Sequence, residues 1–123
     1  MEEPSSPDCK VRLENARRRG TLVICAPVHC ELHACPGITP ETINNFLHDT
    51  AIVADFQVSE EVWQESATRF ARYASRRRRS RGTSPKRMLV DFLVGAHALL
   101  TANCLLTLDK ERYARDFPEL KLL

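Results

Sequence analysis

The chain of 123 residues has the length of one domain, and its 43% hydrophobic and 28% charged content is ordinary for a soluble globular protein. It contains no apolar run of roughly 18 residues or more, which excludes a membrane-spanning helix, and its acidic start (MEEPSSPDCK) is unlike a secretory signal. Five cysteines, an odd number, favour free thiols in a reducing cytoplasm over a disulfide framework. We therefore expect one cytoplasmic domain over residues 1–123, with residues 1–6 flexible.

Positive charge is concentrated in the second half of the chain. The formal net charge is only +2, but residues 1–60 hold nine acids and five bases, whereas residues 61–123 hold seven acids and thirteen bases. Residues 76–84 are expected to form a solvated basic helix end and loop. A polyanionic partner is the alternative, although no aromatic residues interleave this segment to stack bases. In that case RNA phosphates would contact Arg76, Arg77, Arg78, Arg79 and Arg81.

Helices are expected where a serine or threonine precedes a proline or an apolar-periodic segment. Such starts lie at Ser6-Pro7, Thr39-Pro40, Ser59 and Ser84-Pro85. The first helix is expected over residues 7–19, the last of these four carries Asp91, and shorter helices are expected at 29–34 and 109–116. The apolar face of the helix after Ser59 is expected to consist of Trp63, Ala67, Phe70, Ala71 and Ala74.

Short apolar runs predict the strands. They lie at residues 22–28, 51–58, 104–108 and 120–123. Because these strands alternate with helices, the sequence predicts an α/β sandwich with a mostly parallel sheet.

Asp91 is the first candidate for chemistry because it is embedded in an apolar run, where an acid is costly without a partner or a task. It is expected about two turns into its helix, too deep to act as a cap. There Gly95 and Ala98 would leave space beside the carboxylate for an ion, a water or a phosphate. A one-turn ion pair with Arg87 is the alternative. His97 is expected to be a core or supporting residue rather than a general base.

Two further acids follow strands. Asp109 lies just past the strand at 104–108, where open α/β sheets place ligands, and it is equally suited to cap the helix that follows. Glu31 follows the strand at 22–28, and a solvated surface glutamate is its alternative interpretation. If the two acids and Asp91 converge, their like charges require a cation, and oxygen ligands suit Mg²⁺ or Mn²⁺.

A cysteine and histidine cluster suggests zinc as another possibility. Its members are Cys25, His29, Cys30, His33 and Cys35. The segment HCELH differs from the HExxH pattern of zinc proteases, and paired CxxC spacing is absent. Because Cys25 falls in an expected buried strand, it is better interpreted as a small core residue.

In this combination of features the chain resembles a PIN-domain ribonuclease, specifically a VapC-like toxin of a bacterial toxin–antitoxin pair. The match is strongest in DFLVGAHALLTANCLLTLDKERYARDFPELKLL, where an acid opens a helix of small residues, TxD closes a strand and YxxxFPxL follows. It continues backward through EEVWQESATRFARYASRRRR, AIVADFQV, ITPETINNFL and LVICAPVHCEL, and so covers about residues 10–123.

The resemblance implies a three-layer α/β/α sandwich and an acidic groove. In that family the groove binds Mg²⁺ or Mn²⁺, activates a water and cleaves RNA endonucleolytically. Glu31, Asp91 and Asp109 match family acids, as metal ligands and water activators, and Thr107 occupies a supporting position. The resemblance also implies an antitoxin whose C-terminal segment fills the groove, and a homodimer.

One family feature is absent. Family members open with a hydrophobic strand in the middle of the sheet, which ends in an Asp-Thr/Ser-Asn motif, and no apolar run precedes Leu22. The absence of this strand would remove a metal ligand and leave the strands on either side with unpaired backbone groups. We therefore expect a truncated form with poor metal affinity, low activity and marginal solubility. Two rival hypotheses remain: a catalytically impaired protein that keeps only antitoxin- or self-binding, and a small zinc-binding protein that uses the HCELH region.

Overall fold

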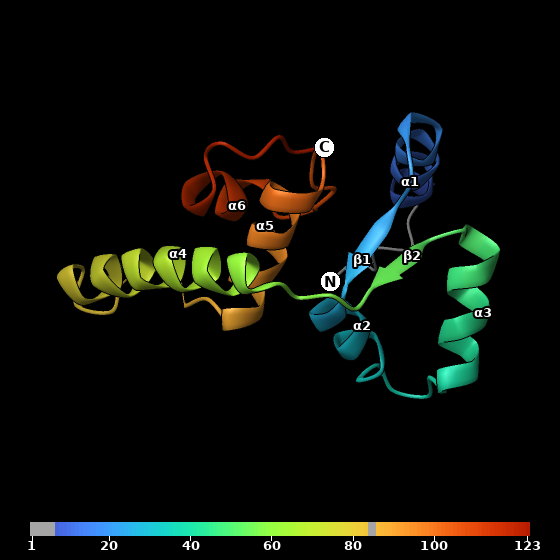
Figure 1. Cartoon of the computed structure of the whole chain (residues 1–123), viewed down its shortest axis with the longest axis horizontal. Helices are drawn as coiled ribbons and strands as arrows, with labels where there is room; N and C mark the ends of the chain where they lie inside the picture. The colour runs from blue at the N-terminus through green and yellow to red at the C-terminus, as the bar shows by residue number, and fades with distance from the viewer. Residues whose placement is uncertain (1–6, 84–85) are drawn as a thin grey trace.

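The structure, a computed structural model, describes residues 7–83 and 86–123, which form two short parallel strands beside a group of packed helices, α4, α5 and α6 (Figure 1). This is the expected α/β class. The expected flexible segment 1–6, the Ser6 cap and the Ser84-Pro85 helix start lie outside the described residues. In chain order the elements are α1 (Pro7–Arg19), β1 (Val23–Cys25), α2 (Ala26–Leu32), α3 (Pro40–Thr50), β2 (Val53–Asp55), α4 (Glu60–Arg79), α5 (Leu89–Thr101) and α6 (Lys110–Asp116).

The predicted starts of α3 and α4 are confirmed. The hydroxyl of Thr39 accepts a hydrogen bond from Thr42 N at 3.1 Å, and the hydroxyl of Ser59 accepts one from Val62 N at 3.2 Å. Each hydroxyl thus satisfies one of the backbone donors that a helix start leaves free. Among the described residues, no helix is both long and apolar enough to cross a membrane.

The strands are shorter than the sequence suggested. β1 and β2 pair in parallel over three residues each, with Val23 opposite Val53 and Cys25 opposite Asp55. β1 ends early because Pro27, which lacks a backbone donor and has a fixed φ, lies in the first turn of α2. β2 ends where the Asp55 carboxylate accepts a hydrogen bond from Gln57 N at 3.0 Å, a local turn that competes with further pairing.

The two C-terminal strands reduce to a single parallel bridge between Leu105 and Leu122. The bridge has two backbone bonds of 2.9 Å, from Leu105 N to Lys121 O and from Leu123 N to Leu105 O. Arg12 links α1 to the segments on both sides of the bridge, because its guanidinium donates to Thr107 O at 3.0 Å and to Leu123 O at 2.8 Å. In the described residues the bridge stands apart from the β1–β2 sheet, so one continuous sheet is not formed.

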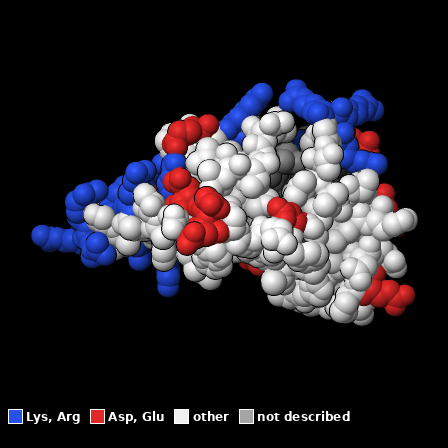
Figure 2. All heavy atoms as spheres, viewed as in Figure 1, with Lys and Arg blue, Asp and Glu red and all other residues white. Residues whose placement is uncertain are grey.

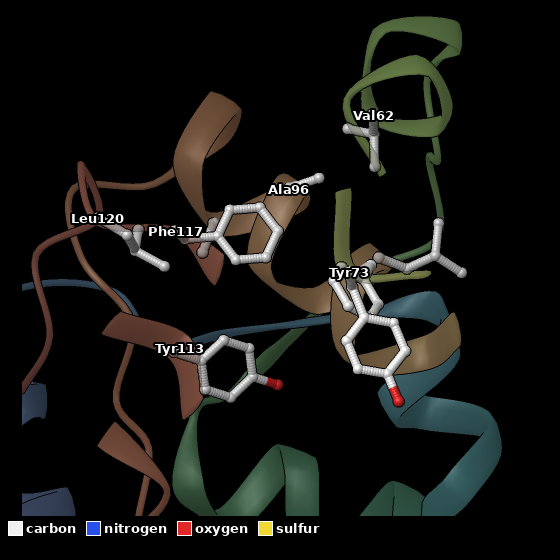
Figure 3. Close-up of a cluster of buried hydrophobic side chains, with 9 residues drawn as sticks. Val62, Tyr73, Ala96, Tyr113, Phe117 and Leu120 are labelled. Atoms are coloured by element: carbon white, nitrogen blue, oxygen red, sulfur yellow. The ribbon is translucent and has the colours of Figure 1, made fainter. Parts of the chain in front are cut away.

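The core lies where α5 packs on α4 and on the C-terminal segment. Phe92 and Phe117 are fully buried, and Val62 of α4 is 1% exposed. Figure 3 shows the ring of Phe117 beside Ala96 of α5, with Tyr113 and Leu120 around it. A Cβ at Gly95 would overlap that ring, so Gly95 is small because Phe117 packs there. The expected space for an ion beside Gly95 is therefore wrong.

The buried face of α4 is rotated from the predicted one. Its buried residues are Val62, Ser66, Arg69 and Tyr73, whereas Trp63 is 48% exposed. Apolar periodicity missed this face because two of its members are polar residues with partners inside the interface. Ser66 donates to Phe92 O at 3.1 Å, and Arg69 donates to Asp116 O at 3.0 Å. Such bonds offset the cost of burying polar groups.

Candidate functional site

Asp91 lies in the first turn of α5, not two turns into it. Because α5 begins at Leu89, the Asp91 carboxylate is placed to accept a hydrogen bond from Met88 N at 3.2 Å, which makes it part of the helix start. Arg87 Nε lies 3.6 Å from the same carboxylate, so the alternative interpretation as a one-turn ion pair is confirmed. The side chain is 27% exposed and can still be reached from solvent.

Asp109 follows the Leu105 bridge and precedes α6. Its side chain makes no capping hydrogen bond, and instead its carboxylate lies 3.3 Å from Arg112 Nε. The backbone of Asp109 is held by Thr107, whose hydroxyl accepts a hydrogen bond from Asp109 N at 3.0 Å. Thr107 therefore does support Asp109, by fixing its main chain rather than its carboxylate.

Glu31 lies on the last turn of α2 and is exposed. α2 contacts both the β1–β2 sheet and α5. Glu31 therefore belongs to an element that touches both halves of the fold, the β1–β2 sheet on one side and α5 with its packing partners on the other. No hydrogen bond or ion pair is recorded for its side chain within residues 7–83 and 86–123.

Tyr113 links the predicted acids electrostatically. Burial is the main cause that raises the pKa of its phenol to about 12, and the negative charges of Asp91 and Asp109 raise it further. The charge of Cys25 also raises the pKa of the Tyr113 phenol. The pKa of the Cys25 thiol is itself raised, mainly by burial and also by the charges of Asp55 and Glu31. The charges of the two acids of the C-terminal half therefore both act on the same phenol. Tyr113 is the tyrosine of the YxxxFPxL motif, but the motif assigns it no role, because the sequence does not show which charges lie near its phenol.

The three acids as placed do not form a metal site. In the part of the chain that the structure describes, no group of three or more His, Cys, Asp or Glu side chains is arranged to hold an ion. Asp91 and Asp109 instead face Arg87 and Arg112. The fit of Mg²⁺ or Mn²⁺ to this arrangement is therefore poor, because a cation and a guanidinium would compete for the same carboxylate oxygens.

The cysteine and histidine cluster is dispersed. Cys25 is buried in β1, whereas Cys30 and Cys35 are exposed, and these three and Cys104 are free thiols, as expected. His29 and His33 lie in contact, with ring centroids 4.7 Å apart, and His33 Nδ1 lies 2.9 Å from His29 O. The histidines are thus engaged with each other and with the main chain.

A pair between a buried histidine and a partly exposed carboxylate was not predicted. His97 is 7% exposed, as expected for a core residue, and its Nε2 lies 2.8 Å from Oδ2 of Asp55. This bond lowers the pKa of Asp55, and the Gln57 N–H lowers it further. The pair joins α5 to the end of β2 and so serves as a link between the two halves of the fold.

Asp116 is a second residue that sequence reasoning missed. It is 6% exposed, and its carboxylate accepts hydrogen bonds from Arg76 and Arg87. The Arg87 guanidinium also lies over the rings of Phe92, at 5.4 Å, and Tyr113, at 5.2 Å. Arg76 therefore has a structural contact with Asp116, although it belongs to the arginine run that was expected to be solvated, with RNA contact as the alternative.

Comparison of the chain with models of protein families, with curated proteins and with solved structures gives no match.

Proposed function

We propose that this chain is a PIN-like endoribonuclease domain of the VapC type, with Glu31, Asp91 and Asp109 as its reactive acids and RNA as its substrate. The observation that supports this best is the order of the acids along the chain, with Glu31 in the helix after β1, Asp91 in α5 and Asp109 after the Leu105 bridge, which resembles the pattern of that family. In such nucleases, carboxylates hold a metal ion that activates the attacking water. The proposal also assigns to the domain the three-layer α/β/α sandwich of that family.

The residues have distinct roles in it. The Met88 N–H orients Asp91, and Thr107 fixes the backbone of Asp109. Mg²⁺ or Mn²⁺ is the cofactor that the proposal assigns, and the acids bind it only if Asp91 and Asp109 give up their arginine partners. A cognate antitoxin and a second copy of the chain are the protein partners that accompany the proposal.

An RNA cleavage assay tests the proposal directly. Purified chain is incubated with a labelled RNA in Mg²⁺, in Mn²⁺ and in EDTA, and Asp91→Asn and Asp109→Asn are compared with the wild type. We expect cleavage that needs the metal and falls at least tenfold in either variant. The control is Asp49→Asn, an exposed acid of α3 whose side chain is 78% accessible, which should cleave like the wild type. Absence of wild-type cleavage, or cleavage that survives both substitutions, contradicts the proposal.

A catalytically impaired protein that keeps only antitoxin- or self-binding is the second candidate. It is favoured by the ion pairs that occupy Asp91 and Asp109 and by exposed apolar side chains on and after the sheet. Val23 and Val53, which are paired neighbours, are 46% and 51% exposed, and Phe56 is 63% exposed. Such exposed apolar surface is typical of a binding face.

Sedimentation equilibrium separates the two candidates. Self-association with no metal-dependent cleavage, lost in Val53→Asp but unchanged in Asp91→Asn, supports the binding role. Cleavage that depends on Asp91 supports the nuclease.

A further inference from the structure

An open hollow of about 480 Å³ lies along the end of α4, and none of the three acids lines it. Arg87, which does line it, lies 3.6 Å from the Asp91 carboxylate. Phe70 and Tyr73 of α4 line it together with the basic side chains of Arg78, Arg81 and Lys86. We refer to the space that these five residues line as the basic hollow.

The hollow exists because the chain doubles back at the end of α4. Gly82 N donates to Arg77 O at 2.9 Å and Arg81 N to Arg78 O at 3.1 Å, which closes the helix with Arg81 (φ 56°) and Gly82 (φ 78°) in the left-handed region. This is the usual way to end a helix with a reversal of direction. The segment then returns along α4, where Arg87 N donates to the Tyr73 hydroxyl at 2.6 Å.

The hollow concentrates positive charge, of which acids balance only a part. Residues 76–87 include seven lysines and arginines and no aspartate or glutamate. Two of these, Arg76 and Arg87, are bound to Asp116. Arg78, Arg81 and Lys86 are exposed and, within the described residues, have no ion-pair partner. Figure 2 shows lysine and arginine gathered over this end of α4. Cations grouped in this way repel one another unless a polyanion covers them.

Helix-end arginines also complement the helix dipole, and that alone would explain a basic last turn. It does not explain Arg81 and Lys86, which lie beyond the helix and line the same hollow. The dipole therefore accounts for only part of this charge.

Aromatic rings provide a second feature that charge alone does not require. The rings of Phe70 and Tyr73 are stacked nearly parallel, with an interplanar angle of 9° and centroids 6.0 Å apart. Phe70 is only half-buried, so part of its ring lines the hollow. Phe70, Ala74 and Arg78 follow one another at spacings of four along α4, so they share one face of that helix, and Arg81 lines the same hollow from the turn after it. This spacing can be found in the sequence, because Phe70 lies before the arginine run rather than between its members.

Cations that surround an aromatic ring match the chemistry of a single-stranded polynucleotide, because cations contact phosphates and rings stack on bases. An acidic peptide would need the cations alone. We propose that the basic hollow binds single-stranded RNA, with phosphates at Arg78, Arg81 and Lys86 and a base against Phe70. The choice of RNA over DNA rests on the proposed function, but binding at this site requires neither the metal nor the three acids.

Fluorescence anisotropy with the full chain and a labelled single-stranded RNA of about 12 nucleotides, in EDTA, tests this site. The variant Arg78→Gln, Arg81→Gln, Lys86→Gln removes three exposed charges and should weaken binding at least tenfold at about 0.1 M salt. The slope of log Kd against log salt should fall by about 2, because each single-strand phosphate contact contributes about 0.7. Phe70→Leu should weaken binding severalfold and leave that slope unchanged, since it removes a ring and no charge.

The matched control is Arg17→Gln, Arg18→Gln, Arg19→Gln, which removes three exposed arginines from the last turn of α1. Its affinity for RNA should change less than twofold. Equal losses in the two triple variants, or no loss in either, would overturn the proposal. So would displacement of the RNA by poly-glutamate of equal charge at equal concentration, because the site would then recognise acidic chains in general.

Asp109→Asn separates this inference from the proposed function, because Asp109 pairs with Arg112, which does not line the hollow, whereas Asp91 pairs with Arg87, which does. It should bind the RNA as tightly as the wild type while cleavage is lost. Wild-type cleavage together with unimpaired binding by the triple glutamine variant of the hollow would overturn the binding site and leave the nuclease proposal intact. Binding that depends on the hollow, with no cleavage, would do the reverse.

Discussion

His97 Nε2 lies 2.8 Å from Asp55 Oδ2, and this bond joins the middle of α5 to the end of β2. The two residues are 42 positions apart, and His97 is 7% exposed. A long-range hydrogen bond made by a buried side chain limits how the two halves of the fold can move relative to each other. It also places a charged group at the junction, where its loss should be felt in stability.

His97→Ala should lower the free energy of unfolding by roughly 1–3 kcal/mol, the cost of removing a buried hydrogen-bonding side chain. Urea denaturation followed by circular dichroism measures it. His48→Ala is the control, because His48 lies beside Asp49 at 3.5 Å with its side chain 89% exposed, and it should have little effect. In a double-mutant cycle with Asp55→Asn, the two losses should sum to more than the loss in the double variant. Strict additivity would show that the contact contributes nothing.

Gly95→Ala should destabilise the protein by about 1–3 kcal/mol, because the added methyl group overlaps the ring of the fully buried Phe117. Gly20→Ala is the matched control: a Cβ at Gly20 has no neighbour within 4 Å, so we expect a change within about 0.5 kcal/mol. The urea midpoints of the two variants provide the comparison. A Gly95→Ala protein as stable as the wild type would mean that Phe117 has another place to go, and the tight packing described above would be wrong.

The pH dependence of stability should reflect Glu119. The Arg69 guanidinium, which donates to Glu119 Oε1 at 3.1 Å, lowers the pKa of that carboxyl to about 2 from an ordinary 4.5. Because the folded state lowers this pKa, the pair stabilises the fold fully above pH 4.5, and its contribution is lost as the pH falls toward 2.

Urea unfolding of wild type and Glu119→Gln at pH 7, 4 and 2 measures this effect. The gap between the two proteins should be largest at pH 7 and should close by pH 2. Glu14→Gln, which changes an exposed acid of α1, should show a small gap at every pH. A Glu119→Gln gap that is constant or grows on acidification would contradict the assignment. Because the Glu119 side chain is 54% exposed, solvent screens its charge and weakens the pair.

The limits of sequence-based prediction are clearest for Asp91 and Asp116. The capping serine and threonine of α3 and α4 were identifiable because their bonds are local, within three residues. Asp91 was singled out for its apolar surroundings, but its partners, Met88 and Arg87, are also local and give it a structural role. Asp116 carries no local signal, since its partners lie 29 and 40 residues away. The burial of Arg69 and Arg87 was missed for the same reason, because both bind the distant Asp116.

Apolar periodicity failed where polar residues fill the interface. The face of α4 predicted from Trp63 and Ala67 is exposed, because Ser66 and Arg69 have hydrogen-bond partners across the contact with α5 and the C-terminal segment. Gly95 illustrates the opposite error, since a small residue beside an acid was interpreted as space for an ion when it accommodates a ring. In both cases the deciding partner is distant in sequence.

Asp116→Asn should be the most destabilising of the substitutions considered, at roughly 3–5 kcal/mol, because it removes the buried carboxylate that Arg87 contacts most closely and leaves only Asp91, 3.6 Å from Arg87 Nε. Arg76→Gln should cost less, since the Arg76 side chain is 36% exposed and can be solvated once its partner is changed. Arg79→Gln, in the same turn of α4 but exposed, should change stability by less than about 0.5 kcal/mol. Thermal and urea unfolding of the three variants give the order, and Arg76→Gln against Arg79→Gln remains informative even if Asp116→Asn does not fold. If Arg76→Gln is as stable as Arg79→Gln, Arg76 contributes nothing through Asp116 and belongs with the exposed arginines.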